Sequence, residues 1–556
     1  MSIDLPEFHP ERAAGYARAG LWGERTVGDE LRHAAARFAD RLALVTPEVR
    51  WTYRELDELT DAFATGLLTT TALGSGDRLM FSMGNVAETV VAYYGAVKAG
   101  VLPVCTLPAH GEREIGLLAE HTGARGHIVQ ADFAGQDLPA LAERLSIEVR
   151  VVARGTVPGA AGYEEILAAG RSPAARAALA DVEIDPDGLV AFQLSGGTTG
   201  LPKVAPRRHR EYVHNSAAWA RALGLTPESV VVHPLPIMHN AGIAAALQPA
   251  HWTGATFVLA PSAEPGELLE ILEAERVTVM PVTPPAVAIR LLDHPRAAAT
   301  DLSALERLVV GGQKLPLEVA QRVERELGLT VRQMFGMAEG MFLYTPTDAP
   351  EWVRHHTVGA PISAGDEVRV LEIGGEAEVG DGELGELACR GPYTIPGYYR
   401  APEHNAATFT ADGFYRTGDL AQRHVVAGGT YYSIEGRIKD VINRGAEKIH
   451  AEEVEEIMVR HPGVHAAALV AMADPVLGER ACAFLIPEPA AEPLTVDTLG
   501  AFLLGQGLAK YKLPERVEIV DEFPLTNVGK VSKKDLRARL ADPDHAASTP
   551  AGAGAR

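Results

Sequence analysis

Residues 194–203, Leu-Ser-Gly-Gly-Thr-Thr-Gly-Leu-Pro-Lys, combine residue types that together bind an anion. The glycines allow tight backbone curvature, so that several N–H groups can converge on one anion. Ser195, Thr198 and Thr199 add hydroxyl donors, and Lys203 adds a positive charge. The order is not that of a Walker loop, in which Gly-Lys is followed by Ser or Thr. The set favours a polyphosphate site, although such a stretch alone is also compatible with a flexible surface loop.

The elements around this stretch indicate an α/β fold. The apolar run 188–194 predicts a buried strand that leads into the loop. Short β-rich runs alternate with helical stretches up to about residue 435, which is typical of a parallel sheet flanked by helices. Strands are predicted at 78–83, 102–105, 126–130, 230–233, 277–280, 307–310 and 331–335, helices at 88–99 and 114–121, and an antiparallel β unit at 366–397.

A change in composition after Gly436 predicts a second, smaller α+β domain. Its expected helices are 451–461, 494–508 and 533–540, and its expected strands are 466–471, 481–486 and 516–520. We therefore predict a large N-terminal domain at 1–438, made of β/α layers with parallel sheets and a small β unit. A C-terminal domain at 439–541 follows, and the Ala/Gly/Pro/Ser-rich tail at 542–556 is predicted to be disordered.

The length and the net charge of the chain limit the classes of protein to which it can belong. A chain of 556 residues is longer than the usual limit for a single hydrophobic core, so two or more domains are expected. The net charge of −22 argues against non-specific binding to nucleic acid or to an anionic membrane. The most apolar region, 89–108, contains Lys98, Gly100 and Pro103, so it predicts a helix and a strand rather than a membrane span. The N-terminus has no secretory signal pattern, and we expect a cytoplasmic protein.

The three cysteines, Cys105, Cys389 and Cys482, lie far apart in apolar runs. We predict that they are buried small hydrophobic residues in a reducing compartment. Their spacing does not match a metal site.

Five motifs in this order resemble those of the adenylate-forming superfamily, which includes acyl- and aryl-CoA ligases, luciferases and the adenylation domains of peptide synthetases. They are 194–203, Phe335-Gly-Met-Ala-Glu339, Tyr415-Arg-Thr-Gly-Asp419, Gly436-Arg-Ile-Lys-Asp440 and Pro524-Leu-Thr-Asn-Val-Gly-Lys530. The resemblance extends from about Trp51 to Leu540.

The resemblance implies a site for ATP and Mg²⁺ and no organic prosthetic group. Phe335 would stack on the adenine, and Asp419 would accept hydrogen bonds from the ribose diol. Glu339 would hold Mg²⁺ against the phosphates, because Mg²⁺ is usually bound by one or two carboxylates and phosphate oxygens. The expected nucleotide-binding residues are Ser195, Gly196, Gly197, Thr198, Thr199, Gly200, Gly312, Phe335, Gly336, Asp419 and Arg437, and the expected catalytic residues are Thr198, Lys203, Glu339 and Lys530.

The resemblance also implies a mobile C-terminal domain that serves two steps. Lys530 would bridge the substrate carboxylate and the α-phosphate, where an ammonium offsets developing charge. Lys439 matches the hinge between the domains. Gly445 and Lys448 match the loop that approaches the acceptor thiol in the second conformation.

The segment 236–245 resembles the acyl-binding segment of stand-alone 2,3-dihydroxybenzoate and salicylate ligases, through the pair His239-Asn240. In such ligases for 2,3-dihydroxybenzoate we expect a Tyr directly after this pair and a Ser four residues further on. This chain has Ala241 and Ala245 there, and Phe342 where a smaller aliphatic residue is usual. The expected substrate-contacting residues are His239, Asn240, Ala241, Ala245, Gly311 and Phe342.

This pattern favours a substituted or bicyclic aromatic acid, such as a hydroxyquinaldate or a methylated hydroxyanthranilate, with salicylate-like acids next. The segment has no acidic residue for an α-amine, which argues against an amino-acid activator.

The expected function is an aryl-acid:AMP ligase that forms aryl-AMP and pyrophosphate and then acylates a thiol, in siderophore or peptide-antibiotic biosynthesis. No carrier motif follows Leu540, so the expected partner is a phosphopantetheinylated aryl carrier protein in trans. The nearest alternative is an aryl-CoA ligase that uses free CoA. A luciferase-like oxygenase and a catalytically silent binding protein are the others, and the presence of both Glu339 and Lys530 argues against the silent protein.

Overall fold

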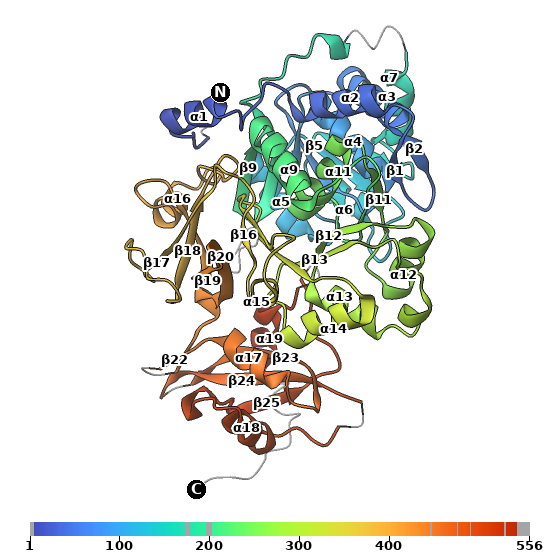
Figure 1. Cartoon of the computed structure of the whole chain (residues 1–556). Coiled ribbons are helices and arrows are strands. Elements are labelled where there is room, and N and C mark those ends of the chain that lie inside the picture. The colour runs from blue at the N-terminus through green and yellow to red at the C-terminus, as the bar shows by residue number, and fades with distance from the viewer. Residues whose placement is uncertain are drawn as a thin grey trace. The chain divides into compact units, whose positions relative to one another are not determined.

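The computed structural model describes residues 5–172, 178–195, 203–444, 447–474, 476–489, 491–526 and 530–541 (Figure 1). The chain forms two compact units. Unit 1 comprises Met1–Gly312, Gln321–Arg369 and Ala388–Arg416, and unit 2 comprises Gln313–Ala320, Val370–Leu387 and Thr417–Arg556. The domain boundary predicted between residues 438 and 439 stays a prediction, and the tail 542–556 lies outside the described residues.

The larger sheet of unit 1 has nine strands. Its six inner strands are parallel, and an antiparallel pairing adds β15 and β16 at one edge and β2 at the other. In spatial order the strands are β16 (Ala360–Pro361), β15 (Phe342–Tyr344), β14 (Arg332–Gly336), β13 (Arg307–Gly311), β12 (Val279–Thr283), β10 (Val230–His233), β11 (Thr256–Leu259), β1 (Leu42–Val45) and β2 (Arg50–Thr52).

The second sheet of unit 1 has seven strands, of which only the last pairing, between β8 and β9, is antiparallel. In this pairing Ser195 lies opposite Lys203, so the two ends of the predicted phosphate loop are held side by side. The strand order is β7 (Ala161–Gly162), β6 (Val149–Ala153), β5 (Gly126–Gln130), β3 (Arg78–Ser82), β4 (Leu102–Val104), β8 (Leu189–Ser195) and β9 (Lys203–Arg208).

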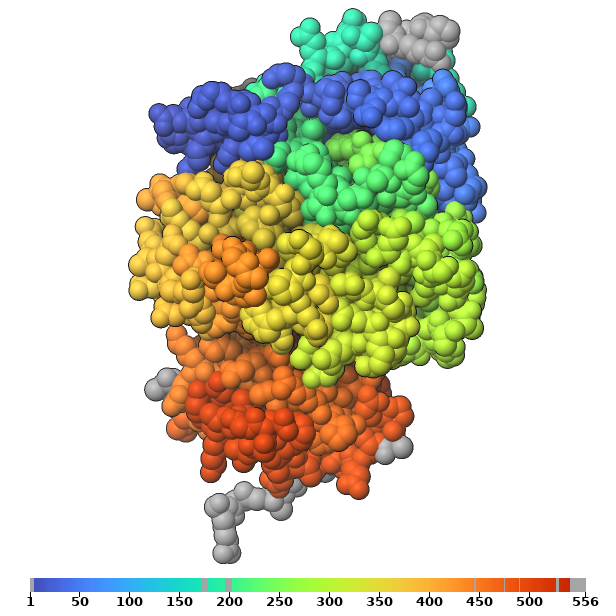
Figure 2. All heavy atoms as spheres, viewed as in Figure 1, coloured from blue at the N-terminus to red at the C-terminus, as the bar shows by residue number. Residues whose placement is uncertain are grey.

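Helices pack against these sheets, and several have clear start signals. Thr26 and Thr52 each form a capping box, with Asp29 and Glu55 respectively. The residues of α12 and α13, which are yellow-green in Figure 1, form part of the surface of unit 1 drawn in Figure 2. The helices are α1 (Pro10–Arg18), α2 (Val27–Phe38), α3 (Tyr53–Thr70), α4 (Ala87–Lys98), α5 (Glu112–Thr122), α6 (Leu138–Arg144), α7 (Tyr163–Gly170), α9 (His209–Leu223), α10 (Asn240–Gly242), α11 (Gln248–Thr253), α12 (Pro265–Ala274), α13 (Pro285–Asp293), α15 (Glu351–His356) and α16 (Pro402–Thr408), with α14 (Leu317–Leu327) spanning residues of both units.

The β unit predicted at 366–397 is present as two strands of a four-stranded sheet. The order is β17 (Glu367–Leu371), β18 (Gly385–Arg390), β19 (Tyr415–Val426) and β20 (Gly429–Arg437). The last two strands form a long antiparallel hairpin that places Asp419 opposite Arg437.

The C-terminal part of unit 2 is a five-stranded sheet with helices, as predicted. Its core includes Val454, Leu469, Leu485 and Leu499, all fully buried. The helix predicted at 451–461 ends earlier, at Met458, before the Pro462-Gly463 pair. The elements are β21 (Ile442–Arg444), β22 (Glu447–Ile449), α17 (Ala451–Met458), β23 (Val464–Asp474), β24 (Gly478–Pro487), α18 (Val496–Gly505), β25 (Arg516–Ile519) and α19 (Lys533–Ala541).

The prediction that the cysteines are buried is confirmed for all three. Burial raises the pKa of the Cys105 thiol, and burial also raises that of Cys482, to about 12. None of the helices in the described ranges is long and apolar enough to cross a membrane.

Candidate active site

The two described ends of the predicted phosphate loop lie beside a tyrosine and a carboxylate. Lys203 Nζ is 5.3 Å from the centre of the Tyr398 ring. Burial lowers the pKa of Lys203, and the nearby Glu339 carboxylate opposes this shift. The predicted loop residues Gly196, Gly197, Thr198, Thr199 and Gly200 lie outside the described residues.

Glu339 lies in the turn after β14 with only 5% of its surface exposed. The Tyr398 hydroxyl donates a hydrogen bond to Glu339 Oε1, and the Tyr398 and Tyr415 hydroxyls are 2.9 Å apart. A buried carboxylate fits a Mg²⁺ ion whose remaining ligands are phosphate oxygens and waters. In the described ranges no three His, Cys, Asp or Glu residues form a metal cluster.

The backbone of this turn is strongly constrained. Gly340 has φ +90°, and a Cβ there would lie 1.7 Å from the Tyr393 carbonyl oxygen. Met341, which is not a glycine, has φ +135°. Such strain persists only where the surroundings impose it. The position of Glu339 is therefore set by tertiary contacts.

The predicted aryl-acid segment contacts the same turn. Asn240 is 3% exposed, and its Oδ1 accepts a hydrogen bond of 2.8 Å from the Tyr212 hydroxyl. Its Nδ2 donates to the Met337 carbonyl at 3.3 Å. His239 caps α10, with Nδ1 accepting from the Ala241 N–H at 3.3 Å. The structure thus brings Asn240 and the Glu339 turn together.

Two of the residues expected to contact the acid, Ala245 and Phe342, pack against Trp219. Ala245 is buried in a π-helix, Ile243–Leu247, and its carbonyl accepts a hydrogen bond of 2.9 Å from Trp219 Nε1. Phe342 meets the Trp219 ring edge to face, with ring centres 5.4 Å apart. π-Helical turns are often found at functional sites.

Two glycines allow β13 and β14 to pack closely behind Phe342. A Cβ on Gly311 would lie 2.4 Å from Met334 Cγ, and one on Gly336 would lie 2.9 Å from Phe342 Cδ1. Gly312 follows with φ +88°. Phe335, the residue expected to stack on adenine, lies next to Gly336 on β14 and is partly exposed.

Unit 2 brings four other predicted residues together, namely Asp419, Arg437, Lys439 and Lys530. Arg437 Nε lies 3.1 Å from Asp419 Oδ1. Burial, together with the Arg437 charge, lowers the pKa of Lys530 to about 8, and Asp419 opposes this. Burial and the charge of Arg437 also lower the pKa of Lys439. Lys448 is exposed on β22, and Gly445 lies outside the described residues.

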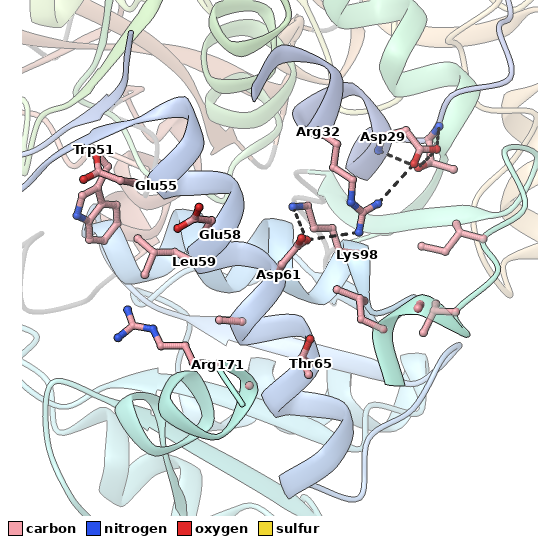
Figure 3. Close-up of a pocket in the computed structure, with 17 residues that line it drawn as sticks. Asp29, Arg32, Trp51, Glu55, Glu58, Leu59, Asp61, Thr65, Lys98 and Arg171 are labelled. Atoms are coloured by element: carbon pink, nitrogen blue, oxygen red, sulfur yellow. Dashed lines mark hydrogen bonds and ion pairs between the residues drawn. The ribbon is translucent and has the colours of Figure 1, made fainter. Parts of the chain in front are cut away.

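A separate cavity of about 920 Å³ lies in unit 1 among α2, α3, α4 and residues 179–184 (Figure 3). In its wall the fully buried Lys98 donates hydrogen bonds to Asp57 and Asp61, at 2.5 and 2.7 Å. None of the predicted site residues that the structure describes lines this cavity.

Three residues near the site were not predicted from the sequence. Tyr212 and Tyr398 contact Asn240 and Glu339 directly, and Arg207 contacts the Ala338 carbonyl in the same turn as Glu339. Arg207 had one local signal, because it is a charged residue at the end of the apolar stretch Val204-Ala-Pro206 in a strand that follows the phosphate loop. No sequence signal marks the two tyrosines, since an aromatic residue on a helix or in a turn usually belongs to the core.

Asp366 is linked to Phe342 through Tyr393, and its raised pKa predicts that the stability of the protein depends on pH. Its Oδ2 accepts a hydrogen bond of 2.7 Å from the Tyr393 hydroxyl, which in turn accepts from the Phe342 N–H at 3.1 Å. Burial raises the pKa of Asp366 to about 7. Its contribution to stability is therefore full below the unfolded-state pKa near 4 and is lost as the pH rises through 7.

We expect Asp366→Asn to remove this loss. The Tm of the variant minus that of the parent protein should be a few degrees more positive at pH 8 than at pH 5. Asp40→Asn, at a side chain that is 90% exposed, is the matched control. A Tm difference between Asp366→Asn and the parent that does not change with pH would contradict the prediction.

Two family models match the chain. The AMP-binding enzyme family model matches residues 31–399, and the model of the AMP-binding enzyme C-terminal domain matches residues 453–530. The chain therefore belongs to the AMP-binding enzyme family, which confirms the resemblance, the fold class and the prediction of an adenylate-forming enzyme.

Similar proteins span almost the whole chain. A 2,3-dihydroxybenzoate-AMP ligase of Bacillus subtilis is 40% identical, covering 96% of this chain and 97% of its own length. A salicylyl-CoA synthase / salicylate adenylyltransferase of a Streptomyces species is 41% identical, covering 95% and 96%. The apo structure of Mycobacterium smegmatis MbtA superimposes with a TM-score of 0.72 at 35% identity, covering 96% and 98%.

Proposed function

We propose that the protein is an aryl-acid:AMP ligase that uses ATP and Mg²⁺. The observation that carries the proposal is the contact of Asn240 with the Met337 carbonyl, two residues before Glu339. It joins a buried carboxamide, suited to the carboxylate or an ortho substituent of an aromatic acid, to the turn that carries the expected magnesium ligand. The names of the similar proteins agree with an aromatic acid as substrate.

In the first half-reaction a carboxylate oxygen of the acid attacks the α-phosphorus of ATP. The new P–O bond forms as the bond to the β-phosphate oxygen breaks, and pyrophosphate leaves. Mg²⁺ held by Glu339 would neutralise phosphate charge. Lys530, when protonated, offsets the charge that develops at the α-phosphate and the leaving group.

In the second half-reaction a thiol sulfur attacks the acyl carbonyl of aryl-AMP, the thiol proton is released, and AMP leaves. No triad is required, because AMP is already a good leaving group. We propose a phosphopantetheinylated carrier protein as acceptor, in siderophore or peptide-antibiotic biosynthesis. Free CoA is the second candidate. Acyl transfer to each thiol from the same aryl-AMP, measured in parallel, separates the two.

The side chains of the acyl segment predict that 2,3-dihydroxybenzoate is not the preferred acid. Alanine at 241 and 245 offers no hydroxyl to a ring substituent, and a buried hydroxyl without a partner costs about 1–3 kcal/mol. Phe342 is 2% exposed and packs against Trp219, and we expect its ring to change the shape of the pocket for the acid. A substituted or bicyclic aromatic acid should therefore be activated better.

The test is acid-dependent pyrophosphate release across a panel of aromatic acids, compared by kcat/KM. Hydroxyquinaldate, methylated hydroxyanthranilates and salicylate should exceed 2,3-dihydroxybenzoate, and Ala245→Ser should shift the ranking toward the latter. A tenfold or larger lead of 2,3-dihydroxybenzoate, about 1.4 kcal/mol, would refute the pocket argument. Absence of release with every aromatic acid would refute the proposed function itself.

A further inference from the structure

Arg207 is a buried arginine for which the proposed reaction has so far no use. It lies on β9, opposite Ala191 of β8, and no part of its side chain is exposed. The strand it belongs to begins at Lys203, directly after the predicted phosphate loop. Buried arginines are rare unless each N–H group finds an acceptor.

The acceptors of Arg207 flank the turn that carries Glu339. Nη1 donates to the Ala338 carbonyl at 2.7 Å, and Nη2 donates to the Tyr393 carbonyl at 2.8 Å. The planar fork of a guanidinium fixes both carbonyls in direction as well as distance. Gly340 is pressed against the same groups, since a Cβ there would come within 3.2 Å of Arg207 Nη2.

The same guanidinium also contacts the support of the aryl-acid residue. It lies 4.7 Å from the centre of the Tyr212 ring, and the Tyr212 hydroxyl holds Asn240 at 2.8 Å. Asn240 in turn donates to Met337, the residue before Ala338. The contacts thus form a closed circuit through Arg207, Tyr212, Asn240, Met337 and Ala338.

The charge of Arg207 is balanced by Glu211, in the first turn of α9. Nε donates to Glu211 Oε2 at 3.3 Å, and both side chains are fully buried. Burial raises the pKa of Glu211, and Arg207 opposes this shift. Because the desolvation of a buried ion pair offsets much of its attraction, the pair is poorly explained by stability alone.

We propose that Arg207 is a positioning residue that couples the binding of the aromatic acid at Asn240 to the binding of Mg²⁺-ATP at Glu339. The inference rests on the proposed function. When one ligand immobilises the circuit, the other ligand binds to a turn that is already ordered, so each raises the affinity for the other. Arg207 itself touches neither ligand.

The experiment measures this coupling directly. The dissociation constant of the Mg²⁺ complex of α,β-methylene-ATP is determined by calorimetry with and without the aromatic acid that the panel ranks first. In the parent protein the acid should tighten nucleotide binding about fivefold or more. In Arg207→Met this factor should fall to one, while Arg207→Lys, which keeps a charge but loses the fork, should retain part of it.

Arg207→Met leaves Glu211 without its partner and therefore risks misfolding. Tyr212→Phe opens the circuit by removing one hydroxyl and no charge, and it should also abolish most of the coupling while Tm changes little. Arg210→Met is the matched control, because the nearby Arg210 forms ion pairs with Glu24 and Asp187 instead. It should keep the full factor.

Two results would overturn the inference even though aromatic acids are still activated. One is full coupling in folded Tyr212→Phe and Arg207→Lys proteins, and the other is the absence of coupling in the parent protein. Failure of the proposed function gives a different result, because then no aromatic acid would release pyrophosphate even with the parent protein, and the inference would fall with it.

Discussion

Lys530→Ala should lower the rate of aryl-AMP formation by about 100- to 1000-fold, which corresponds to about 2.7–4 kcal/mol. In the proposed reaction the substitution removes a charge that acts only while the α-phosphorus is being attacked. Transfer of the aryl group from preformed aryl-AMP to a thiol should stay within about twofold of the parent protein. Pyrophosphate release measures the first step, and loss of added aryl-AMP measures the second.

The reverse pattern is expected at the loop that the resemblance assigns to thiol transfer. A bulky residue in place of Gly445 should slow transfer and spare adenylate formation. Lys534→Ala, beside Lys533 in α19, is a matched control for loss of a positive charge in unit 2. If Lys530→Ala and the Gly445 variant slow the same step equally, the division of labour within the C-terminal region is refuted.

The pKa of Lys530 adds a pH signature to this prediction. With a pKa of about 8 in the free protein, the lysine is charged below pH 8 and loses its charge as the pH rises further. The kcat/KM for ATP should therefore fall above about pH 8. Lys530→Arg keeps its charge and should remove this fall, even where its absolute rate is lower.

Glu339→Gln should lower kcat/KM for ATP by about 100-fold and raise the Mg²⁺ concentration for half-maximal rate by about tenfold. The glutamine oxygen can still accept the hydrogen bond of Tyr398, so the change isolates the loss of charge. Initial rates over a Mg²⁺ titration at fixed free ATP measure both quantities. An unchanged Mg²⁺ dependence would remove Glu339 from the metal site.

Tyr398→Phe is the complementary variant for this prediction. It keeps the carboxylate and removes the donor that orients it, together with the contact to the Tyr415 hydroxyl. We expect a loss of about tenfold with a smaller change in Mg²⁺ dependence. The two variants together distinguish the charge of Glu339 from its orientation.

Much of the fold was predictable because its signals are local. The strands 126–130 and 230–233 occur with the predicted bounds, since each contains consecutive β-branched residues. The strand predicted at 277–280 instead spans Val279–Thr283, because Pro281 is accommodated within β12. The π-helix at Ile243–Leu247 was not predicted, as its alanine-rich sequence equally suits an α-helix.

The residues of the site could be predicted only where they belong to a sequence motif. Glu339, Asp419 and Asn240 were singled out from their motifs, and their roles stay predictions. Arg207 contacts Ala338 and Tyr393, which are 131 and 186 residues away along the chain. No periodicity or composition records a contact over such a separation, and it appears only once the strands are packed.

The burial of the three cysteines bears on chemoselectivity. Aryl-AMP, the proposed intermediate, is an acylating agent that reacts with thiolates, and a protein that forms it exposes its own nucleophiles to it. Cys105, Cys389 and Cys482 are all buried, and the raised pKa values of Cys105 and Cys482 keep those two thiols protonated at neutral pH. These cysteine thiols are thereby protected against acylation, and among thiols the mixed anhydride is left to react with the one that the acceptor brings.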